Sequence, residues 1–320
     1  MTADWNYHSK SKHKRTGINM NNDLQAWFNG KLISRHDATV PILSHGFSRA
    51  SAIFDVFGVH PGPQGPMAFR MDDHLKRLTK SAELLEMELA YSPEEITAAV
   101  KATVKANRIE RGIVKILAFW SEEVITQLVL DAKLDVAVFA IPESEELVLD
   151  KKHALSACLS KWRKLHPETV PVGAKACANY LNGYLARKDA VTRGFDIGIL
   201  LGTDGFLAEG STESVFIVKE GVLLTPPLGR VLSSITRLSV LQAIPEIGLA
   251  AVERPITAGE LLAADEIFTV HTGTKVEPIG RFEDRELKTP GPVTQRVMHL
   301  IDDIMQFKDE RFKGWFRPLA

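Results

Sequence analysis

Short apolar runs separated by turn residues predict strands in the first half of the chain. Residues 24–28 and 31–33 flank Asn29-Gly30, a pair that is typical of a tight β-hairpin turn. Another strand is expected over 53–59, where Pro61-Gly62-Pro63 follow and end it. Similar runs predict further strands over 113–120, 126–130 and 136–141.

Two segments between these strands have the periodicity of amphipathic helices. From Met71 to Leu85, apolar residues recur at spacings of four and three, so they line one face of a helix. Ser92-Pro93-Glu94-Glu95 combines a capping box with proline at the first helical position, which predicts that a second helix starts there.

The second half of the chain mixes the two patterns. Strands are expected over 154–159, 197–201, 214–218 and 266–270. Helices are expected over 179–193, from about 234, and from about Pro292. Because strands and helices do not alternate strictly, this order indicates the α+β class rather than a doubly wound sheet.

Composition divides the chain into four parts. Residues 1–23 contain four basic residues among polar ones, and we expect a mobile or loosely docked arm rather than a basic docking arm. Residues 143–150 are charged and lack periodicity, so we expect a linker there. It would separate a domain over 24–142 from a second domain over 151–320.

Charge and cysteine content exclude several classes of protein. Lysine and arginine total 39 against 40 acidic residues, which argues against a nucleic-acid partner. No apolar run approaches the roughly 18–20 residues that span a bilayer, and no segment resembles a signal peptide. Cys158 and Cys177 are the only cysteines, which fits a cytoplasmic protein without disulfides. The scattered histidines predict no metal site, and His74 is expected to be partly exposed and structural.

Two polar segments of the second half are candidates for chemistry. Lys175 lies among small residues just before an expected helix, so burial there would lower its pKa and make it a nucleophile. An exposed loop lysine is the simpler interpretation of that residue alone. Glu209, followed by Gly-Ser-Thr, precedes an apolar strand, where a plain polar turn would look the same.

Three further segments fit an anionic ligand. Ser233-Ser234-Ile235-Thr236 opens a helix, where free amides and the helix dipole suit a phosphate, although a simple N-cap would also explain the serines. Thr272-Gly273-Thr274 directly follows an apolar strand, and Phe69-Arg70 precede the first helix.

Taken in order, these segments resemble the class IV aminotransferases, which are fold-type IV pyridoxal-phosphate enzymes, and especially the branched-chain amino acid aminotransferases. The resemblance runs from about Trp27 to Met305, and Lys175 and Glu209 lie 34 residues apart, as in the family. Other family landmarks are Trp27-Phe28-Asn29-Gly30, Leu43-Ser44-His45, Phe69-Arg70 through Leu78, Asn179-Tyr180-Leu181-Asn182 and Gly291-Pro292-Val293-Thr294.

The resemblance implies a fold and an assembly. It implies a two-domain α+β protein resembling the D-amino acid aminotransferases, with a smaller α/β domain and a larger, β-barrel-like domain that binds the cofactor. Pyridoxal 5'-phosphate would lie between the domains, and the protein would be a homodimer or a higher homo-oligomer. Its partners would be amino acid and keto acid substrates.

The resemblance also implies roles for individual residues. Lys175 would carry the cofactor and then move the proton at the substrate Cα. Glu209 would face the pyridine nitrogen and Tyr180 the phenolic oxygen. The phosphate would be held by a set of four residues, namely Arg70, Ile235, Thr236 and Thr274.

The substrate pocket is where this sequence departs from the family. Arg49 stands where relatives usually have an aromatic residue, while Phe54 keeps the aromatic character of a second wall position. Lys115 stands where branched-chain enzymes typically have an arginine for the distal carboxylate of glutamate. Thr272 and Gly273 are expected to contact substrate.

Transamination between an amino acid and a 2-keto acid is therefore the expected activity, with branched-chain substrates favoured. A D-amino acid or (R)-amine transaminase, or an enzyme like aminodeoxychorismate lyase, would share the cofactor residues. A catalytically inactive binding protein on the same scaffold is a further alternative, against which the joint presence of Lys175, Tyr180 and Glu209 argues.

Overall fold

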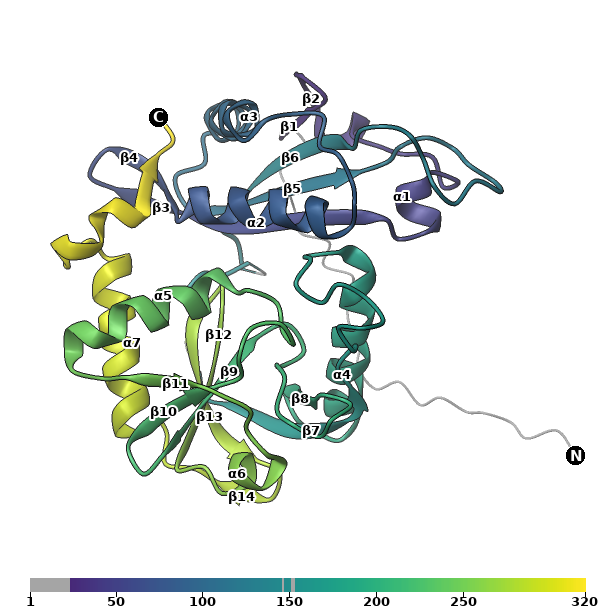
Figure 1. Ribbon diagram of the computed structural model, residues 1–320. Helices are drawn as coiled ribbons and strands as arrows, with labels where there is room; N and C mark the ends of the chain where they lie inside the picture. Colours follow the sequence, from purple (N-terminus) through teal and green to yellow (C-terminus); the bar gives the residue numbers. More distant parts are fainter. Residues whose placement is uncertain (1–23, 146, 151–152) are drawn as a thin grey trace, which may run out of the picture.

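The computed structural model describes residues 24–145, 147–150 and 153–320, which form two β-sheets with helices packed on them (Figure 1). The expectation for an arm over 1–23 lies outside the described residues. None of the helices in the described ranges has both the length and the apolar character that crossing a bilayer requires.

The first sheet has seven strands in the order β15-β4-β3-β5-β6-β1-β2. These strands are β1 Gln25–Phe28, β2 Lys31–Ser34, β3 Ala52–Gly62, β4 Gly65–Phe69, β5 Gly112–Phe119, β6 Asp135–Pro142 and β15 Phe316–Pro318. Helices α2 (Met71–Leu84) and α3 (Pro93–Ala106) pack on one face of it, and α1 (His45–Ser48) lies beside its end (Figure 1).

Side chains alternate between the two faces of this sheet, so one face contributes to the core and the other faces the second half of the chain. In β5, Val114, Ile116 and Ala118 are fully buried against α2 and α3, while Ile113 and Lys115 are half-buried on the opposite face. That opposite face of β3 and β5 is therefore left for polar and ligand-contacting side chains.

The second sheet has eight strands in the order β11-β10-β9-β12-β13-β7-β8, with β14 paired to β13. The strands are β7 Leu155–Arg163, β8 Ile197–Leu201, β9 Ser214–Lys219, β10 Val222–Thr225, β11 Ala251–Glu253, β12 Glu266–His271, β13 Lys275–Phe282 and β14 Arg285–Glu286. The helices of this half are α4 Tyr180–Thr192, α5 Ile235–Ala243, α6 Ala258–Leu262 and α7 Pro292–Met305. Short 3-10 helices occur at Arg35–Asp37, Cys177–Asn179, Ile244–Ile247 and Glu310–Trp315.

One segment of the second half is bound to the first sheet. Ala176 forms a bridge to Ile53, and the Phe54 N–H donates to the carbonyl oxygen of Lys175 at 3.0 Å. The chain around Lys175 thus continues the hydrogen bonding of β3, which fixes it between the two sheets.

Most expected elements occur, and the exceptions have physical reasons. The Asn29-Gly30 hairpin is confirmed, with φ of 44° and 91° at its two turn residues. The capping box before α3 and the α4 helix are also confirmed. The strand expected over 126–130 was wrong: Leu128 and Val129 lie in a loop and are 70% and 79% exposed.

Two boundaries also differ from expectation. Strand β3 continues through Pro61 to Gly62, because Pro61 lies beyond the end of β5 and pairs only with β4, so its missing N–H leaves no gap. The chain after residue 151 does not stay in the second sheet, since β15 returns to pair with β4 in the first. The linker over 143–150, whose described residues contain no helix or strand, stays a prediction.

Candidate active site

A cavity lies between the two sheets and is lined by charged and polar side chains from both halves of the chain. Helix α2 contributes Arg77, the segment before α4 contributes Lys175, the first residue of α4 is Tyr180, and the loop before β9 contributes Glu209. The remaining polar lining comes from Lys164, Asn179, Ser211, Thr212, Glu213, Ser214, Ser234, His271 and Thr272. Five of the residues singled out in the sequence therefore face one space, namely Lys175, Tyr180, Glu209, Ser234 and Thr272.

Lys175 has the environment of a nucleophilic amine. Its Nζ donates to the Tyr180 hydroxyl at 2.6 Å and lies 4.9 Å from the centre of the Phe54 ring. Burial, followed by the positive charge of Arg77, lowers the pKa of Lys175 to about 8. A substantial fraction of this amine is thus neutral near pH 8, as attack on a carbonyl requires.

Tyr180 is held in the same place by a second contact. Its ring packs edge-on against Phe54 at 4.8 Å between ring centres. Burial, and next the charge on Glu209, raise the pKa of Tyr180 above its usual value. The phenol therefore stays protonated at neutral pH and can donate to an oxygen in the cavity.

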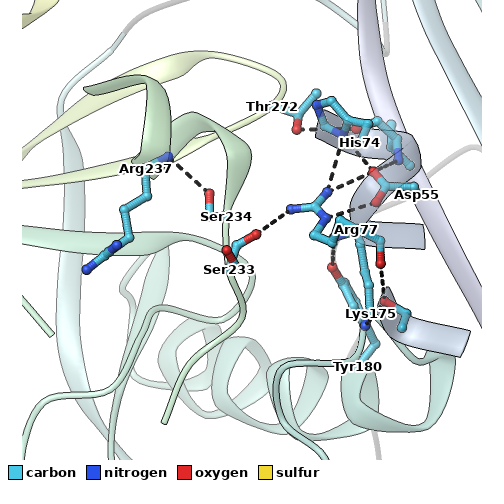
Figure 2. A network of polar contacts seen from close by, with 11 residues as sticks. Asp55, His74, Arg77, Lys175, Tyr180, Ser233, Ser234, Arg237 and Thr272 are labelled. Atoms are coloured by element: carbon cyan, nitrogen blue, oxygen red, sulfur yellow. Dashed lines mark hydrogen bonds and ion pairs between the residues drawn. The ribbon is translucent and has the colours of Figure 1, made fainter. Parts of the chain in front are cut away.

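Arg77 reaches the cavity through a buried network on β3 and α2 (Figure 2). Its Nε and Nη2 donate to the two oxygens of Asp55 at 2.9 and 2.8 Å, and its Nη1 donates to the Ser233 carbonyl at 3.0 Å. His74 Nδ1 lies 2.6 Å from Asp55 Oδ1. The expectation that His74 is partly exposed was wrong, since it is 2% exposed.

The charges in this network support one another. Burial disfavours the charge on Asp55, but Arg77 and His74 outweigh burial and hold the pKa of Asp55 well below its usual range. Burial also works against the charge on Arg77, and Asp55 more than compensates and raises the pKa of Arg77. Burial lowers the pKa of His74, which favours its neutral form.

The N-terminus of α5 lies beside Arg77. Ser234 is the N-cap, and its hydroxyl accepts from the Arg237 N–H at 3.2 Å (Figure 2). Ile235 and Thr236 occupy the first two helical positions, where a helix provides no acceptor for the backbone N–H groups. The positive end of the helix dipole and the Arg77 guanidinium, which contacts Ser233, are therefore neighbours, and together they suit an anion, while Ile235 and Thr236 themselves do not line the cavity.

Glu209 lies elsewhere on the cavity wall. Its Oε1 accepts from Lys164 Nζ at 2.5 Å, and its Oε2 accepts from the Leu232 N–H at 3.3 Å. Lys164 is 7% exposed and was not foreseen from the sequence. The Lys164 ammonium and the Leu232 N–H together fix the orientation of this carboxylate.

A second cation, Lys115, lies close to the Phe54 ring. Lys115 Nζ lies 5.3 Å from the centre of the Phe54 ring, on the face of the first sheet that borders the second half of the chain. The Phe54 ring thus has two cations close to it, Lys115 and Lys175.

Other residues expected at the site lie away from this cavity. Arg70 is buried and directs its guanidinium to Asp73, Ser239 and Gln242, with Trp315 stacked on it. It is the N-cap of α2 and has the left-handed conformation, with φ of 51°, and it does not line the cavity that Arg77 lines.

Arg49 and the turn after β12 account for the other residues that were expected at the site. Arg49 is exposed and donates to the Ile125 carbonyl oxygen at 3.0 Å, so it pairs locally instead of entering the cavity. In the turn after β12, Thr272 lines the cavity, and its hydroxyl lies 3.5 Å from the Val56 carbonyl. Gly273 and Thr274 continue the same turn without lining that cavity.

Comparison with known proteins places this geometry in a family. Residues 52–282 match the model of the family described as "Amino-transferase class IV", which is more than half of the chain. The chain belongs to the class IV aminotransferases. A relative from Pseudomonas aeruginosa named branched-chain-amino-acid aminotransferase is 30% identical over 295 residues, covering 90% of this chain and 95% of the relative.

Solved structures give the same result. The branched-chain aminotransferase of Thermoproteus uzoniensis with norvaline has a TM-score of 0.87 and 33% identity to this class IV aminotransferase, covering 93% of this chain and 99% of that one. The Thermobaculum terrenum enzyme, solved in its PLP form, has a TM-score of 0.85, 28% identity and the same coverage of both chains. The two-domain fold-type IV architecture and the aminotransferase activity expected from the sequence are thereby confirmed.

Enzymes of this class use pyridoxal phosphate, and the residues of the cavity fit that group. A lysine with a lowered pKa, a phenol, a carboxylate and a guanidinium beside a helix N-terminus all face one space. These are the groups that a carbonyl, a phenolic oxygen, a pyridine nitrogen and a phosphate would each require.

Proposed function

We propose that this class IV aminotransferase uses pyridoxal phosphate to transfer the amino group of branched-chain L-amino acids to a 2-keto acid. The observation that carries the proposal is the placement of Lys175, whose amine has a pKa of about 8 and contacts Tyr180 in a cavity with an anion site. The relatives support the choice of substrate by their names.

Different residues at the cavity would bind different parts of the cofactor. Arg77 and the amides of Ile235 and Thr236 would bind the phosphate, so Arg77 takes the role that the sequence suggested for Arg70. Glu209, held by Lys164, would keep a proton on the pyridine nitrogen. When bound, the cofactor supplies a carbonyl carbon for amines and a ring that accepts an electron pair from the substrate Cα.

Lys175 and Tyr180 would handle protons at the reacting carbon. The Lys175 amine would hold the cofactor at its carbonyl carbon, and when Nζ is free it would accept the proton from the substrate Cα and return it one carbon away. Tyr180, protonated because of its raised pKa, would hold the phenolic oxygen and restrict where Nζ can move.

Phe54 and Lys115 would shape the substrate side. Phe54 offers an apolar surface beside Lys175 for a branched side chain. Lys115 also lies beside that ring and would attract the second carboxylate of glutamate, the donor that restores the amino form of the cofactor. Thr272 borders the same space from the β12 turn, while Gly273 and Thr274 stay predictions as site residues.

A substrate panel on purified protein tests the proposal. L-leucine, L-isoleucine and L-valine with 2-ketoglutarate should give glutamate, whereas D-alanine and (R)-amines should not. Release of pyruvate without a keto acid acceptor would favour a lyase instead. Turnover of D-alanine in preference to L-leucine would overturn the assignment.

We also infer a homodimer, supported by an apolar surface at one end of the first sheet. The loop between β5 and β6 extends beside α1 (Figure 1), and its Ile125, Leu128 and Val129 are 81%, 70% and 79% exposed. Phe47 of α1 and the preceding Ile42 are 68% and 77% exposed. Apolar side chains concentrated in this way mark an interface.

Light scattering tests the assembly. We expect the mass of a dimer or a multiple of it for the native protein, and a shift toward monomer for Leu128→Asp. A monomeric native protein would contradict the inference.

Cys158 and Cys177 are both free thiols, which supports the expected cytoplasmic location.

A further inference from the structure

Ser81 connects the two groups on which the proposed chemistry depends. It lies on α2, its side chain is fully buried, and it does not line the cavity. Its hydroxyl accepts from the Lys175 backbone N–H at 2.9 Å and donates to the Arg77 carbonyl oxygen at 2.8 Å. One oxygen atom thus joins the main chain of Lys175 to that of Arg77.

The other backbone group of Lys175 is also held by the first half of the chain. Its carbonyl oxygen accepts from the Phe54 N–H at 3.0 Å, and the neighbouring Ala176 bridges to Ile53. Strand β3 and helix α2 therefore fix both sides of the Lys175 peptide. Of these hydrogen bonds to the Lys175 backbone, only the one from Lys175 N–H to the Ser81 hydroxyl involves a side chain, so a substitution can remove it.

We propose that Ser81 is a positioning residue that sets the separation between the Lys175 amine and the Arg77 anion site. The inference rests on the proposed function and goes beyond it. A ligand attached to Lys175 at one end and held by its phosphate at the other has a fixed length. Both ends bind together only if the two residues are held at the matching separation.

Removal of the hydroxyl would act on Lys175 more than on the helix. In Ser81→Ala, the buried Lys175 N–H loses its acceptor, which is the costly outcome for a backbone donor. The Arg77 carbonyl loses only its second donor, because the helix still supplies the backbone N–H of residue 81. The segment around Lys175 would then shift relative to α2.

The decisive experiment compares two ligands that differ only in the phosphate. Pyridoxal phosphate engages both Lys175 and the anion site, whereas pyridoxal engages Lys175 alone. For Ser81→Ala we expect the dissociation constant of pyridoxal phosphate to rise about 10-fold, the size of one lost hydrogen bond, and that of pyridoxal to change less than about 2-fold. Ser81→Thr, which keeps the hydroxyl, should restore the wild-type ratio.

Thr103→Ala is the matched control. Thr103 is also fully buried on a helix of the first half, and its hydroxyl donates to the Ala99 carbonyl at 2.7 Å, but it lies on α3 away from the cavity. This variant should bind both ligands as the wild type does. If Ser81→Ala does not fold, Ser81→Cys fills the same space with a weak acceptor and should change the ratio in the same direction.

A second readout needs no cofactor. The rate at which acetic anhydride labels Lys175 in the apoprotein, followed by mass spectrometry over a range of pH, reports the pKa of that amine. We expect a value near 8 in the wild type and a rise toward 10.5 in Ser81→Ala, as water reaches the loosened segment.

The outcomes separate the two claims. Two results for Ser81→Ala would overturn the role of Ser81 and leave the proposed function standing. One is that the dissociation constants of pyridoxal phosphate and pyridoxal rise by the same factor. The other is that both dissociation constants and the labelling of Lys175 equal those of the wild type. If the wild type binds no pyridoxal phosphate at Lys175, the proposed function fails, and the labelling experiment still decides whether Ser81 positions this lysine.

Discussion

Replacing Asp55 with asparagine would break the network that holds Arg77 in the cavity. The Asp55 side chain is 0% exposed and that of Arg77 is 8% exposed, so water cannot replace the lost charge. The Oδ1 atom accepts from Arg77, His74 and the Val56 N–H, while Oδ2 accepts from Arg77 Nε at 2.9 Å. An asparagine would place an amide donor against a guanidinium donor at one of these positions.

The expected cost follows from burial. Removing one partner of a buried ion pair leaves the other charge uncompensated and costs about 3–5 kcal/mol. Because asparagine keeps one oxygen for the contacts of Oδ1, we expect about 3 kcal/mol of lost stability for Asp55→Asn. We also expect weaker stabilisation by inorganic phosphate, because the Arg77 fork is no longer oriented.

Urea unfolding at pH 7, with and without phosphate, measures both effects. Asp72→Asn is the control, since Asp72 lies on α2, the helix of Arg77, is 61% exposed and pairs with the exposed Arg317. A surface pair of that kind is worth about 0–1 kcal/mol. If Asp55→Asn cost no more than Asp72→Asn, the network would not be what holds Arg77.

The pH dependence of the same experiment has a defined sign. The pKa of Asp55 is lowered from 3.8 in the unfolded chain, so its contribution is complete well above pH 4. It is lost as the pH falls below that value toward the folded pKa. The stability difference between wild type and Asp55→Asn should therefore shrink in acid.

Three further predictions concern the cavity and its surroundings. Borohydride reduction of the holoenzyme followed by peptide mapping should find the cofactor on Lys175, and a label on another lysine would contradict the site. Glu209→Gln should keep the cofactor but lower kcat about 10²–10³-fold, and unchanged turnover would remove Glu209 from the ring nitrogen. Arg49→Tyr should change kcat/KM for glutamate and leucine by the same factor, because Arg49 pairs with Ile125 outside the cavity; unequal factors would return it to the substrate pocket.

The parts of the site that local sequence specifies were predictable. Lys175 and Tyr180 lie five residues apart on one turn, so their contact depends on little beyond the local chain. Ser234 is an N-cap, whose preference for hydroxyl side chains can be read directly. Such features are encoded over a few residues and do not depend on how the rest of the chain packs.

The parts of the site that depend on contacts between residues far apart in the sequence could not be predicted. Arg70 is the N-cap of α2 and Arg77 lies in the middle of that helix, and the sequence offers no local reason to prefer one for the anion site. The choice is made by Asp55, 22 residues before Arg77, and by Ser239 and Gln242, which bind Arg70 from 169 and 172 residues away. Lys164 was missed for the same reason, since it ends a run of basic residues that resembles an exposed strand end.

The return of β15 to the first sheet has a consequence for synthesis of the protein. Phe316 pairs with Phe69, and Leu319, at 1% exposed, completes the core between that sheet and its helices. About 170 residues separate these groups from the end of β6. At a translation rate of about 5–20 residues per second, β4 waits on the order of ten seconds or longer with its outer edge unpaired. During that time nascent chains on neighbouring ribosomes would present the same edge to one another, so slower translation of the second half should lower the yield of folded protein.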